Sequence, residues 1–184
     1  MKPIKIDNLF SEEELFFIYN HVLKSNGWII NASPGKLSYS TNKNFSNCPQ
    51  LIIRSNEGTI FNSSLYLYGQ SLVYRLKKIL ENKKVGLHSR LRRMWFNVSY
   101  NGADNHWLHD DGVENAQTIL LFLTPVWKTG WRGSFYVDGQ EFSFQPGSAV
   151  IFDSKEFHTG EEPISATYNW LRLTCNIVVD TIDK

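Results

Sequence analysis

Residues 133–152, GSFYVDGQEFSFQPGSAVIF, decide the fold class of this chain. Asp138-Gly139 is a strong hairpin signal, because both positions of a two-residue turn between strands favour residues that tolerate positive φ. The apolar run Ala149–Phe152 follows Pro146-Gly147 and therefore predicts a further short strand. Strands that follow one another this closely, with no helix between them, favour a barrel or a jelly roll.

The second half of the chain continues this pattern, with short apolar or alternating segments separated by turn residues. The expected strands are Met94–Tyr100, Thr118–Thr124, Gly133–Val137, Gln140–Phe144, Ala149–Phe152 and Trp170–Val179. We expect this core to occupy about residues 90–180. The long stretch Ser33–Pro49 has no sustained period, and a loop of this length is often functional, for example as a lid over a substrate.

The first half carries two expected helices. Ser11 followed by Glu14 forms a capping-box pattern, which predicts a helix from there to about Lys24. A second helix is expected over Ser63–Glu81, where leucines recur at helical spacing. The sequence therefore predicts one α+β, mainly β domain over residues 1–184, in which a helical part of about residues 1–85 packs on one sheet of the core.

Composition narrows the class of protein. The chain has 184 residues, is 42% hydrophobic and 20% charged, and has a formal net charge of +1. A nearly neutral chain of ordinary composition gives no reason to expect binding to nucleic acid or to acidic membranes. The one dense basic run, Arg90–Arg93, is typical of a solvated strand edge. Cys48 and Cys175 are widely spaced, as free thiols of a reducing compartment are.

The expected location is the cytoplasm, because no leader pattern and no membrane-length apolar stretch is visible. We expect a monomer or a weak dimer. The bias toward Asn, Lys, Ser and Ile would suit a bacterial or phage genome rich in AT.

His109 and Asp111 form the most informative polar pattern. On an extended strand, residues two apart point to the same side, so this imidazole and this carboxylate could bind one ion together. A second imidazole, His158, follows the apolar run that ends at Phe152. Two histidines and one carboxylate are the ligands of non-haem Fe(II) oxygenases, and they leave coordination positions open for chemistry.

Arg172 is the candidate anchor for an acidic ligand. In residues 170–179 apolar positions alternate with Arg172, Thr174 and Asn176, which is the pattern of a strand with one polar face. If that face lines a cavity, the guanidinium matches the geometry of a carboxylate. An iron site beside such an anchor could hold a 2-oxo acid, with its keto end on the metal. Lys155 is the alternative anchor.

These motifs together resemble the Fe(II)/2-oxoglutarate-dependent dioxygenases, and among them the small prolyl 4-hydroxylase-type members of bacteria and viruses. The resemblance covers roughly Met94 to Val179. The matching segments are Tyr100-Asn101-Gly102 ahead of His109, Thr118–Leu123 for Thr-x-Leu-x-Tyr-Leu, Gln145–Phe152 for the strand before the distal histidine, and His158–Ile164 for His-x-Gly-x-Pro-Val. Trp131 and Arg132 interrupt the usual Gly-Gly pair, and the interval from His158 to Arg172 is longer than usual.

The resemblance implies a double-stranded β-helix of jelly-roll or cupin-like type. It implies that His109, Asp111 and His158 bind Fe(II) as the catalytic centre, and that Arg172, Tyr100 and Thr118 bind 2-oxoglutarate. It further implies O2 as cosubstrate, ascorbate as a possible reductant, release of succinate, and hydroxylation of a prolyl residue in a peptide or protein. Related halogenases replace the carboxylate with a small residue, so Asp111 favours hydroxylation.

Other interpretations stay open at this point. The substrate could be another amino-acid residue, a small molecule or a nucleobase, although the alkylation-repair type carries an Arg-x-Asn-x-Thr-x-Arg motif that this chain lacks. A cupin-like metal-binding protein without enzymatic activity would need the histidines alone. His106 is a rival ligand, but its odd spacing from His109 directs it to the other face of a strand, and Asp104 and Asp110 are disfavoured on similar grounds. Trp127 and Trp131 could line a peptide groove or pack in the core.

Overall fold

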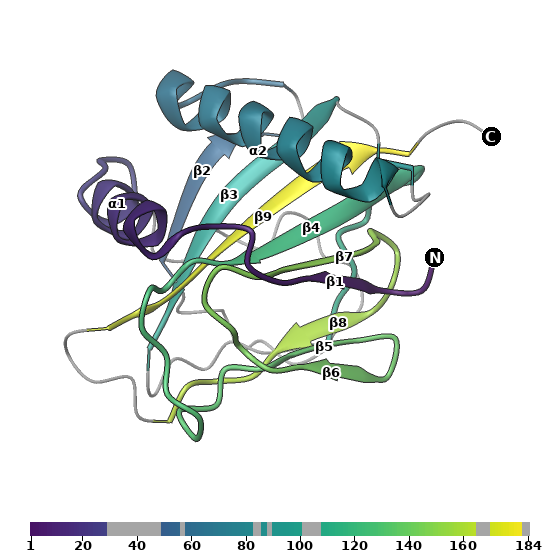
Figure 1. Ribbon diagram of the computed structural model, residues 1–184. Coiled ribbons are helices and arrows are strands. Elements are labelled where there is room, and N and C mark those ends of the chain that lie inside the picture. Colours follow the sequence, from purple (N-terminus) through teal and green to yellow (C-terminus); the bar gives the residue numbers. More distant parts are fainter. Residues whose placement is uncertain are drawn as a thin grey trace, which may run out of the picture.

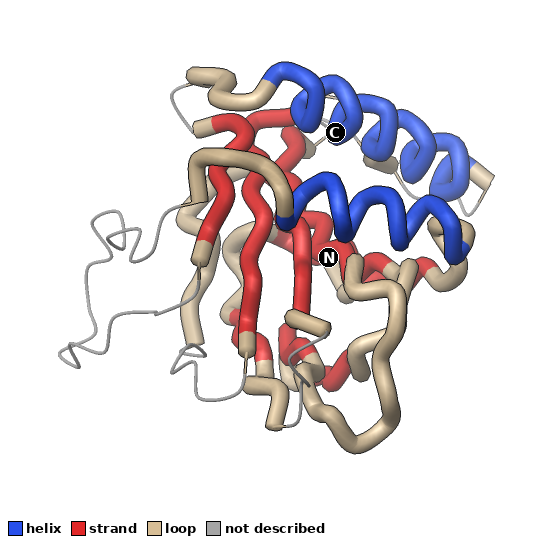
Figure 2. The backbone as a smooth tube through the Cα atoms, turned by 90° about the vertical axis from the view of Figure 1, so that its left-hand side faces the viewer, coloured by secondary structure: helices blue, strands red, loops and turns tan. Residues whose placement is uncertain are grey.

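The larger sheet of the protein has two helices on one face and a smaller sheet on the other (Figures 1 and 2). The computed structural model describes residues 1–28, 49–55, 58–82, 86–87, 90–100, 108–164 and 170–181. The elements are β1 (Ile4–Ile6), α1 (Glu12–Leu23), β2 (Gln50–Arg54), α2 (Ser63–Glu81), β3 (Leu91–Ser99), β4 (Ala116–Phe122), β5 (Phe135–Val137), β6 (Gln140–Phe142), β7 (Ala149–Asp153), β8 (His158–Gly160) and β9 (Arg172–Asp180). The expected mainly β fold with a jelly-roll core is confirmed.

Antiparallel pairing joins six strands into the larger sheet, in the order β1-β7-β4-β9-β3-β2. The smaller sheet has the order β6-β5-β8. The central strand β9 is buried along its whole length because both of its faces are covered. The N-terminal part, expected to be helical, also contributes β1 and β2 to the two edges of the larger sheet.

Both helices begin as their sequences predict. The Ser11 hydroxyl accepts a hydrogen bond from the Glu14 amide, and the Glu14 carboxylate accepts one from the Ser11 amide, which completes the capping box. The bounds of α2 are those expected, and the Asn62 side chain caps its first turn. None of the helices in the described residues is long and apolar enough to span a membrane.

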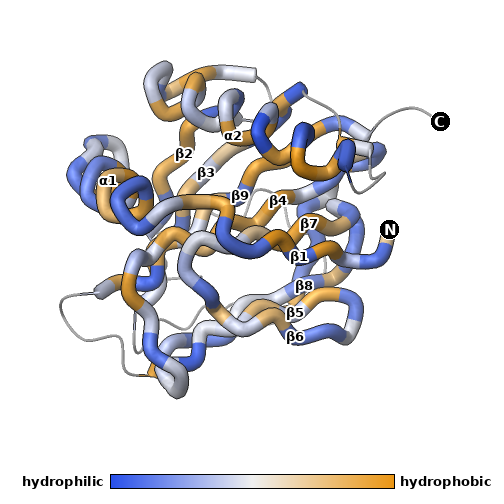
Figure 3. Tube along the Cα trace, viewed as in Figure 1, coloured by the Kyte–Doolittle hydropathy of each residue, from blue (hydrophilic) through white to orange (hydrophobic). Residues whose placement is uncertain are grey.

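Alternate residues of the larger sheet point to its two opposite faces, and each face forms an apolar layer. Ile119, Leu121 and Ile177 face the helices and pack with the buried faces of α1 and α2. Leu120 and Phe152 face the smaller sheet and form a second cluster with residues of β5. Figure 3 shows the resulting hydrophobic stretches along β4 and β7. The polar alternate residues of β9 lie on this second side, between the two sheets.

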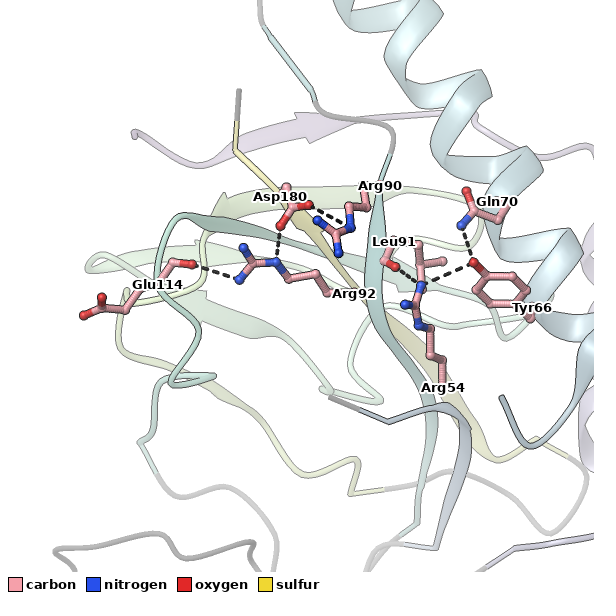
Figure 4. Close-up of polar contacts among 8 residues, drawn as sticks. All are labelled: Arg54, Tyr66, Gln70, Arg90, Leu91, Arg92, Glu114 and Asp180. Atoms are coloured by element: carbon pink, nitrogen blue, oxygen red, sulfur yellow. Dashed lines mark hydrogen bonds and ion pairs between the residues drawn. The ribbon is translucent and has the colours of Figure 1, made fainter. Parts of the chain in front are cut away.

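Ion pairs stabilise the C-terminal end of β9, at Asp180. Arg90 and Arg92 both pair with the Asp180 carboxylate, and the Arg92 guanidinium also donates to the Glu114 carbonyl oxygen (Figure 4). The basic run is thus more than the solvated strand edge that its sequence suggests. Because Glu114 lies between Asp111 and β4, these contacts help to fix the segment that leads out of the candidate site.

Cys175 should be inert in the native protein. It lies on β9 facing the helices and has no exposed surface, and this burial raises the pKa of its thiol well above the ordinary value. The thiolate is the reactive form, so alkylation should require unfolding. We expect mass spectrometry after iodoacetamide treatment to find the Cys175 peptide unmodified in native protein and modified in denaturant. Rapid native labelling would contradict this packing. Cys48 lies outside the described residues and is followed as a separate peptide.

Candidate metal centre

His109 and His158 are held side by side by their own backbones. The His109 amide donates to the His158 carbonyl oxygen at 3.1 Å, and the His158 amide donates to the His109 carbonyl oxygen at 2.8 Å. His109 thereby extends the smaller sheet beyond β8, and the centroids of the two imidazole rings lie 4.4 Å apart. Segments far apart in the sequence therefore present their rings at one place.

Asp111 completes the group. Its amide donates to the Ser154 carbonyl oxygen at 3.0 Å, which holds the residue beside the end of β7. The ligand atoms offered by His109, Asp111 and His158 all lie within 4.8 Å of one another. Ligands about 2.1 Å from one ion lie about 3 to 4 Å apart, so small side-chain rotations bring these three atoms onto a single metal.

The hydrogen bonding of His158 suits a metal ligand. Its Nδ1 lies 2.9 Å from the Glu156 carbonyl oxygen, which can only accept, so Nδ1 carries the hydrogen. The lone pair of Nε2 is then available, and a backbone carbonyl on the other ring nitrogen is the usual partner of a metal-bound histidine. Burial lowers the pKa of His158, with the nearby Asp111 carboxylate opposing this effect. Both the tautomer and the neutral form therefore match what a metal requires.

Aromatic rings close one side of this group. Phe152 and Phe135 lie 4.9 Å and 5.6 Å from the His158 ring, measured between centroids, and both are buried. Apolar walls of this kind exclude water from around a metal and leave its ligands fixed. Two imidazole nitrogens and one carboxylate oxygen match the donor set of non-haem Fe(II) sites that keep coordination positions open.

Arg172 lies on the same side of the larger sheet, at the start of β9. It is 4% exposed, its Nε donates to the Gly133 carbonyl oxygen at 3.0 Å, and its guanidinium stacks over Phe144 with its carbon 5.5 Å from the ring centroid. Its backbone neighbour across the sheet is Ser99. The side chain is thus fixed at its middle by a carbonyl and on one face by a ring, which is an arrangement suited to planar recognition of a carboxylate.

Solved structures with this architecture exist. A prolyl-4-hydroxylase from Pseudomonas putida matches with a TM-score of 0.64 and 15% identity, over 97% of this chain and 92% of that one. The chain has the fold of the 2-oxoglutarate-dependent oxygenases. A Trichoplax adhaerens prolyl hydroxylase, solved with a peptide of hypoxia inducible factor, matches with a TM-score of 0.62 and 16% identity, over 97% of this chain and 83% of that one. The α-ketoglutarate-dependent carbocyclase SnoK of nogalamycin biosynthesis matches with a TM-score of 0.62 and 14% identity, over 98% of this chain and 80% of that one.

Sequence comparison alone does not detect this likeness: no family model and no curated protein matches the chain. The likeness lies in the oxygenase fold, at identities of 14 to 16% for these three structures. Those values explain why short motifs such as His109-Asp110-Asp111 are all that remains to be recognised in the sequence.

The structure places the other residues that the sequence suggested for the site in different surroundings. Thr118 is buried beside Asp111 and its hydroxyl donates to the Asp111 carboxylate. Tyr100 follows β3 and is 38% exposed, and its contact with a cosubstrate stays a prediction. The ammonium of Lys155, the alternative anchor, pairs with Glu114 at the surface, and its contact with an acidic ligand stays a prediction. His106, Asp104 and all of the expected loop Ser33–Pro49 except Pro49 lie outside the described residues.

Trp127 and Trp131 pack beside Phe144, the ring over which the Arg172 guanidinium lies. Trp127 packs at a tilt against Phe144, with ring centroids 4.4 Å apart, and meets Trp131 edge-on at 5.4 Å. Its Nε1 donates to the Arg132 carbonyl oxygen. This packing favours the second of the two interpretations of these residues, a structural one. Sequence reasoning missed Ser154 and Phe144, because neither a lone serine nor a lone phenylalanine carries a recognisable motif.

Gly133 is a position where this packing leaves little room. It has a φ of +86°, and a Cβ atom there would lie 3.0 Å from Trp127 Cζ2 and 3.1 Å from Arg172 Cδ and Nε. If Arg172 anchors 2-oxoglutarate, as the family resemblance implies, Gly133→Ala should displace the guanidinium and raise the KM for 2-oxoglutarate about 10-fold, since a loss of about 1.4 kcal/mol in binding has that size. Steady-state kinetics with varied 2-oxoglutarate measures it.

Gly130→Ala is the matched control, because Gly130 has a similar φ of +94° with nothing within 4 Å of its added Cβ. Both variants should lose about 1 to 2 kcal/mol of stability to the left-handed backbone. An unchanged KM in Gly133→Ala, or an equal rise in Gly130→Ala, would show that crowding at Arg172 does not matter.

Proposed function

We propose that the protein is an Fe(II)- and 2-oxoglutarate-dependent hydroxylase. His109, Asp111 and His158 hold the iron, and Arg172 binds the distal carboxylate of 2-oxoglutarate. One observation carries this proposal: two imidazoles and a carboxylate converge within 4.8 Å on a fold shared with oxygenases of this kind. The hydrogen bond of His158 Nδ1 to a carbonyl supports it, since it leaves Nε2 for the metal.

The chain's own residues bind, orient and exclude water. Iron with its 2-oxo acid supplies the oxidising power, so that O2 and 2-oxoglutarate are converted to succinate and CO2 while a C–H bond of the substrate becomes C–OH. Arg172 sets where the 2-oxo acid lies relative to the three ligands. Phe135 and Phe152 keep bulk water away from the His158 side of the centre.

For the substrate we propose a prolyl residue in a peptide or protein. Two of the similar structures are prolyl hydroxylases, and one of them was solved with a peptide fragment. The carbocyclase shows that the same fold also serves small molecules of a biosynthetic pathway. The experiment must therefore separate the reaction type from the choice of substrate.

The test incubates Fe(II)-loaded protein with 2-oxoglutarate, O2 and a library of proline-containing peptides, with and without ascorbate. Iron-dependent succinate together with a +16 mass on proline would support both parts of the proposal. Succinate without a +16 peptide would keep the oxygenase and move the substrate to another class. Stoichiometric Fe(II) binding without any succinate would instead favour a cupin-like binding protein, and the hydroxylase proposal would fall.

A further inference from the structure

Two buried hydroxyl groups lie behind the Asp111 carboxylate. Thr118 on β4 and Ser154, directly after β7, have no exposed surface. The Thr118 hydroxyl lies 2.5 Å from Asp111 Oδ2 and 2.9 Å from the Ser154 hydroxyl. The sheet brings them together because Thr118 is paired with Phe152, two residues before Ser154.

The direction of these hydrogen bonds follows from the groups themselves. An ionised carboxylate only accepts, so the single hydroxyl hydrogen of Thr118 points to Asp111 Oδ2. Thr118 Oγ1 must then accept from Ser154, so the Ser154 hydroxyl hydrogen points to Thr118. The result is a one-way series from Ser154 through Thr118 to Asp111, in which each hydroxyl is a donor to the next oxygen.

Ser154 also holds the backbone of the same ligand. Its carbonyl oxygen accepts from the Asp111 amide at 3.0 Å, and its own amide donates to the Ala116 carbonyl oxygen at 3.1 Å. Asp111 is thus held at two points, its amide directly by Ser154 and its carboxylate through Thr118. A carboxylate fixed in this way cannot rotate about its last bond without breaking a partly buried hydrogen bond, which is costly.

We propose that Thr118 and Ser154 are positioning residues that fix the Asp111 carboxylate through Oδ2 and leave its Oδ1 available to a metal ion. This inference rests on the proposed metal centre and gives Thr118 a role different from the cosubstrate contact that the family resemblance implies. Outer-shell partners of this kind typically change metal affinity by about 10- to 100-fold when they are mutated. Without the series, Oδ2 loses the hydrogen bond that orients it and the carboxylate is free to rotate.

The test titrates the protein with Co(II), a spectroscopically visible substitute for Fe(II), with no 2-oxoglutarate present. We expect Thr118→Val, which removes the hydroxyl at nearly constant volume, to weaken Co(II) binding about 10- to 100-fold and to change the visible absorption of the bound ion. Thr118→Ser should restore both to within about 3-fold, since the hydroxyl alone matters. Ser154→Ala should have a smaller effect in the same direction.

Thr124→Val provides the matched control. Thr124 is equally buried, and its hydroxyl also makes two hydrogen bonds, but these go to the Leu171 carbonyl oxygen and the Leu173 amide. This variant should lose stability as Thr118→Val does, while its Co(II) affinity and spectrum stay those of the parent protein. A loss of affinity shared by both variants would assign the effect to general destabilisation and overturn the proposal.

Three further outcomes are decisive. If the Thr118→Val variant binds Co(II) with the affinity and spectrum of the parent protein, the positioning role is overturned, but the metal centre is not. A parent protein that binds no Co(II) or Fe(II) removes the metal centre, and this inference with it. If Thr118→Val does not fold, Ser154→Ala and Thr118→Ser decide: parental affinity in Ser154→Ala, or a loss in Thr118→Ser as large as about 10-fold, contradicts the series.

Discussion

Asp111→Ala is expected to reduce Fe(II) affinity by at least about 100-fold and to abolish succinate formation. Removing a metal ligand outright should exceed the loss that follows from changing only its outer partners. The two histidines would remain held by their shared backbone hydrogen bonds, so the fold around the site should persist. Anaerobic Fe(II) titration and a succinate assay, with circular dichroism to follow folding, measure the three quantities.

Asp110→Ala is the natural control. Asp110 is the adjacent residue in the sequence and carries the same charge, yet it is not among the three residues whose ligand atoms converge. Its replacement should leave Fe(II) affinity within about 3-fold, because a nearby unbound charge acts only through a screened interaction. Equal losses in the two variants would mean that general charge, and not coordination by Asp111, holds the metal.

Arg172→Ala is expected to raise the KM for 2-oxoglutarate by about 30-fold or more while leaving metal affinity in the absence of 2-oxoglutarate unchanged. Truncating one partner of a buried, hydrogen-bonded charge pair costs about 2 to 5 kcal/mol, and each 1.4 kcal/mol is about tenfold in affinity. Initial rates at varied 2-oxoglutarate, together with Fe(II) titration of the same preparation, separate the anchor from the metal centre.

Two companion variants sharpen this result. Arg172→Lys keeps the charge but loses the planar fork and the Nε that donates to Gly133, so it should recover only part of the affinity. Arg132→Ala removes a nearby but largely exposed guanidinium that pairs with Glu161, and it should leave the KM unchanged. A KM that rises equally in Arg132→Ala would point to the local field as the cause. A parental KM in Arg172→Ala would place the anchor elsewhere.

The helices and most strands of the second half could be predicted because local signals determine them. The capping box at Ser11 and the leucine spacing of α2 act within one or two helical turns, and the Asp138-Gly139 turn joins β5 to β6. The strands β1, β2 and β8 were missed for the opposite reason. β1 and β8 have three residues each, too few for a period to show, and β2 becomes a strand by pairing with the distant β3.

In the candidate site, too, sequence signals identify some residues, whereas other contacts depend on the fold. His109, Asp111, His158 and Arg172 could be proposed because spacing and family motifs single them out. The contact between Thr118 and Asp111 could not, since the partner of the Thr118 hydroxyl depends on how β4 pairs with β7 and where Ser154 then lies. Lys155 was a reasonable alternative by charge alone. Its pairing with Glu114 follows from the fold and is invisible in the pattern of the sequence.

The reciprocal amide bonds between His109 and His158 have a thermodynamic consequence. The entropy of bringing remote ligands together is lost when the chain folds, before any ion arrives, so the centre is preorganised. In this respect it differs from a zinc finger, whose chain orders only around its metal. Ion capture then adds to the stability of an already folded protein by linkage, about 2.7 kcal/mol when the free ion is at 100 times its dissociation constant.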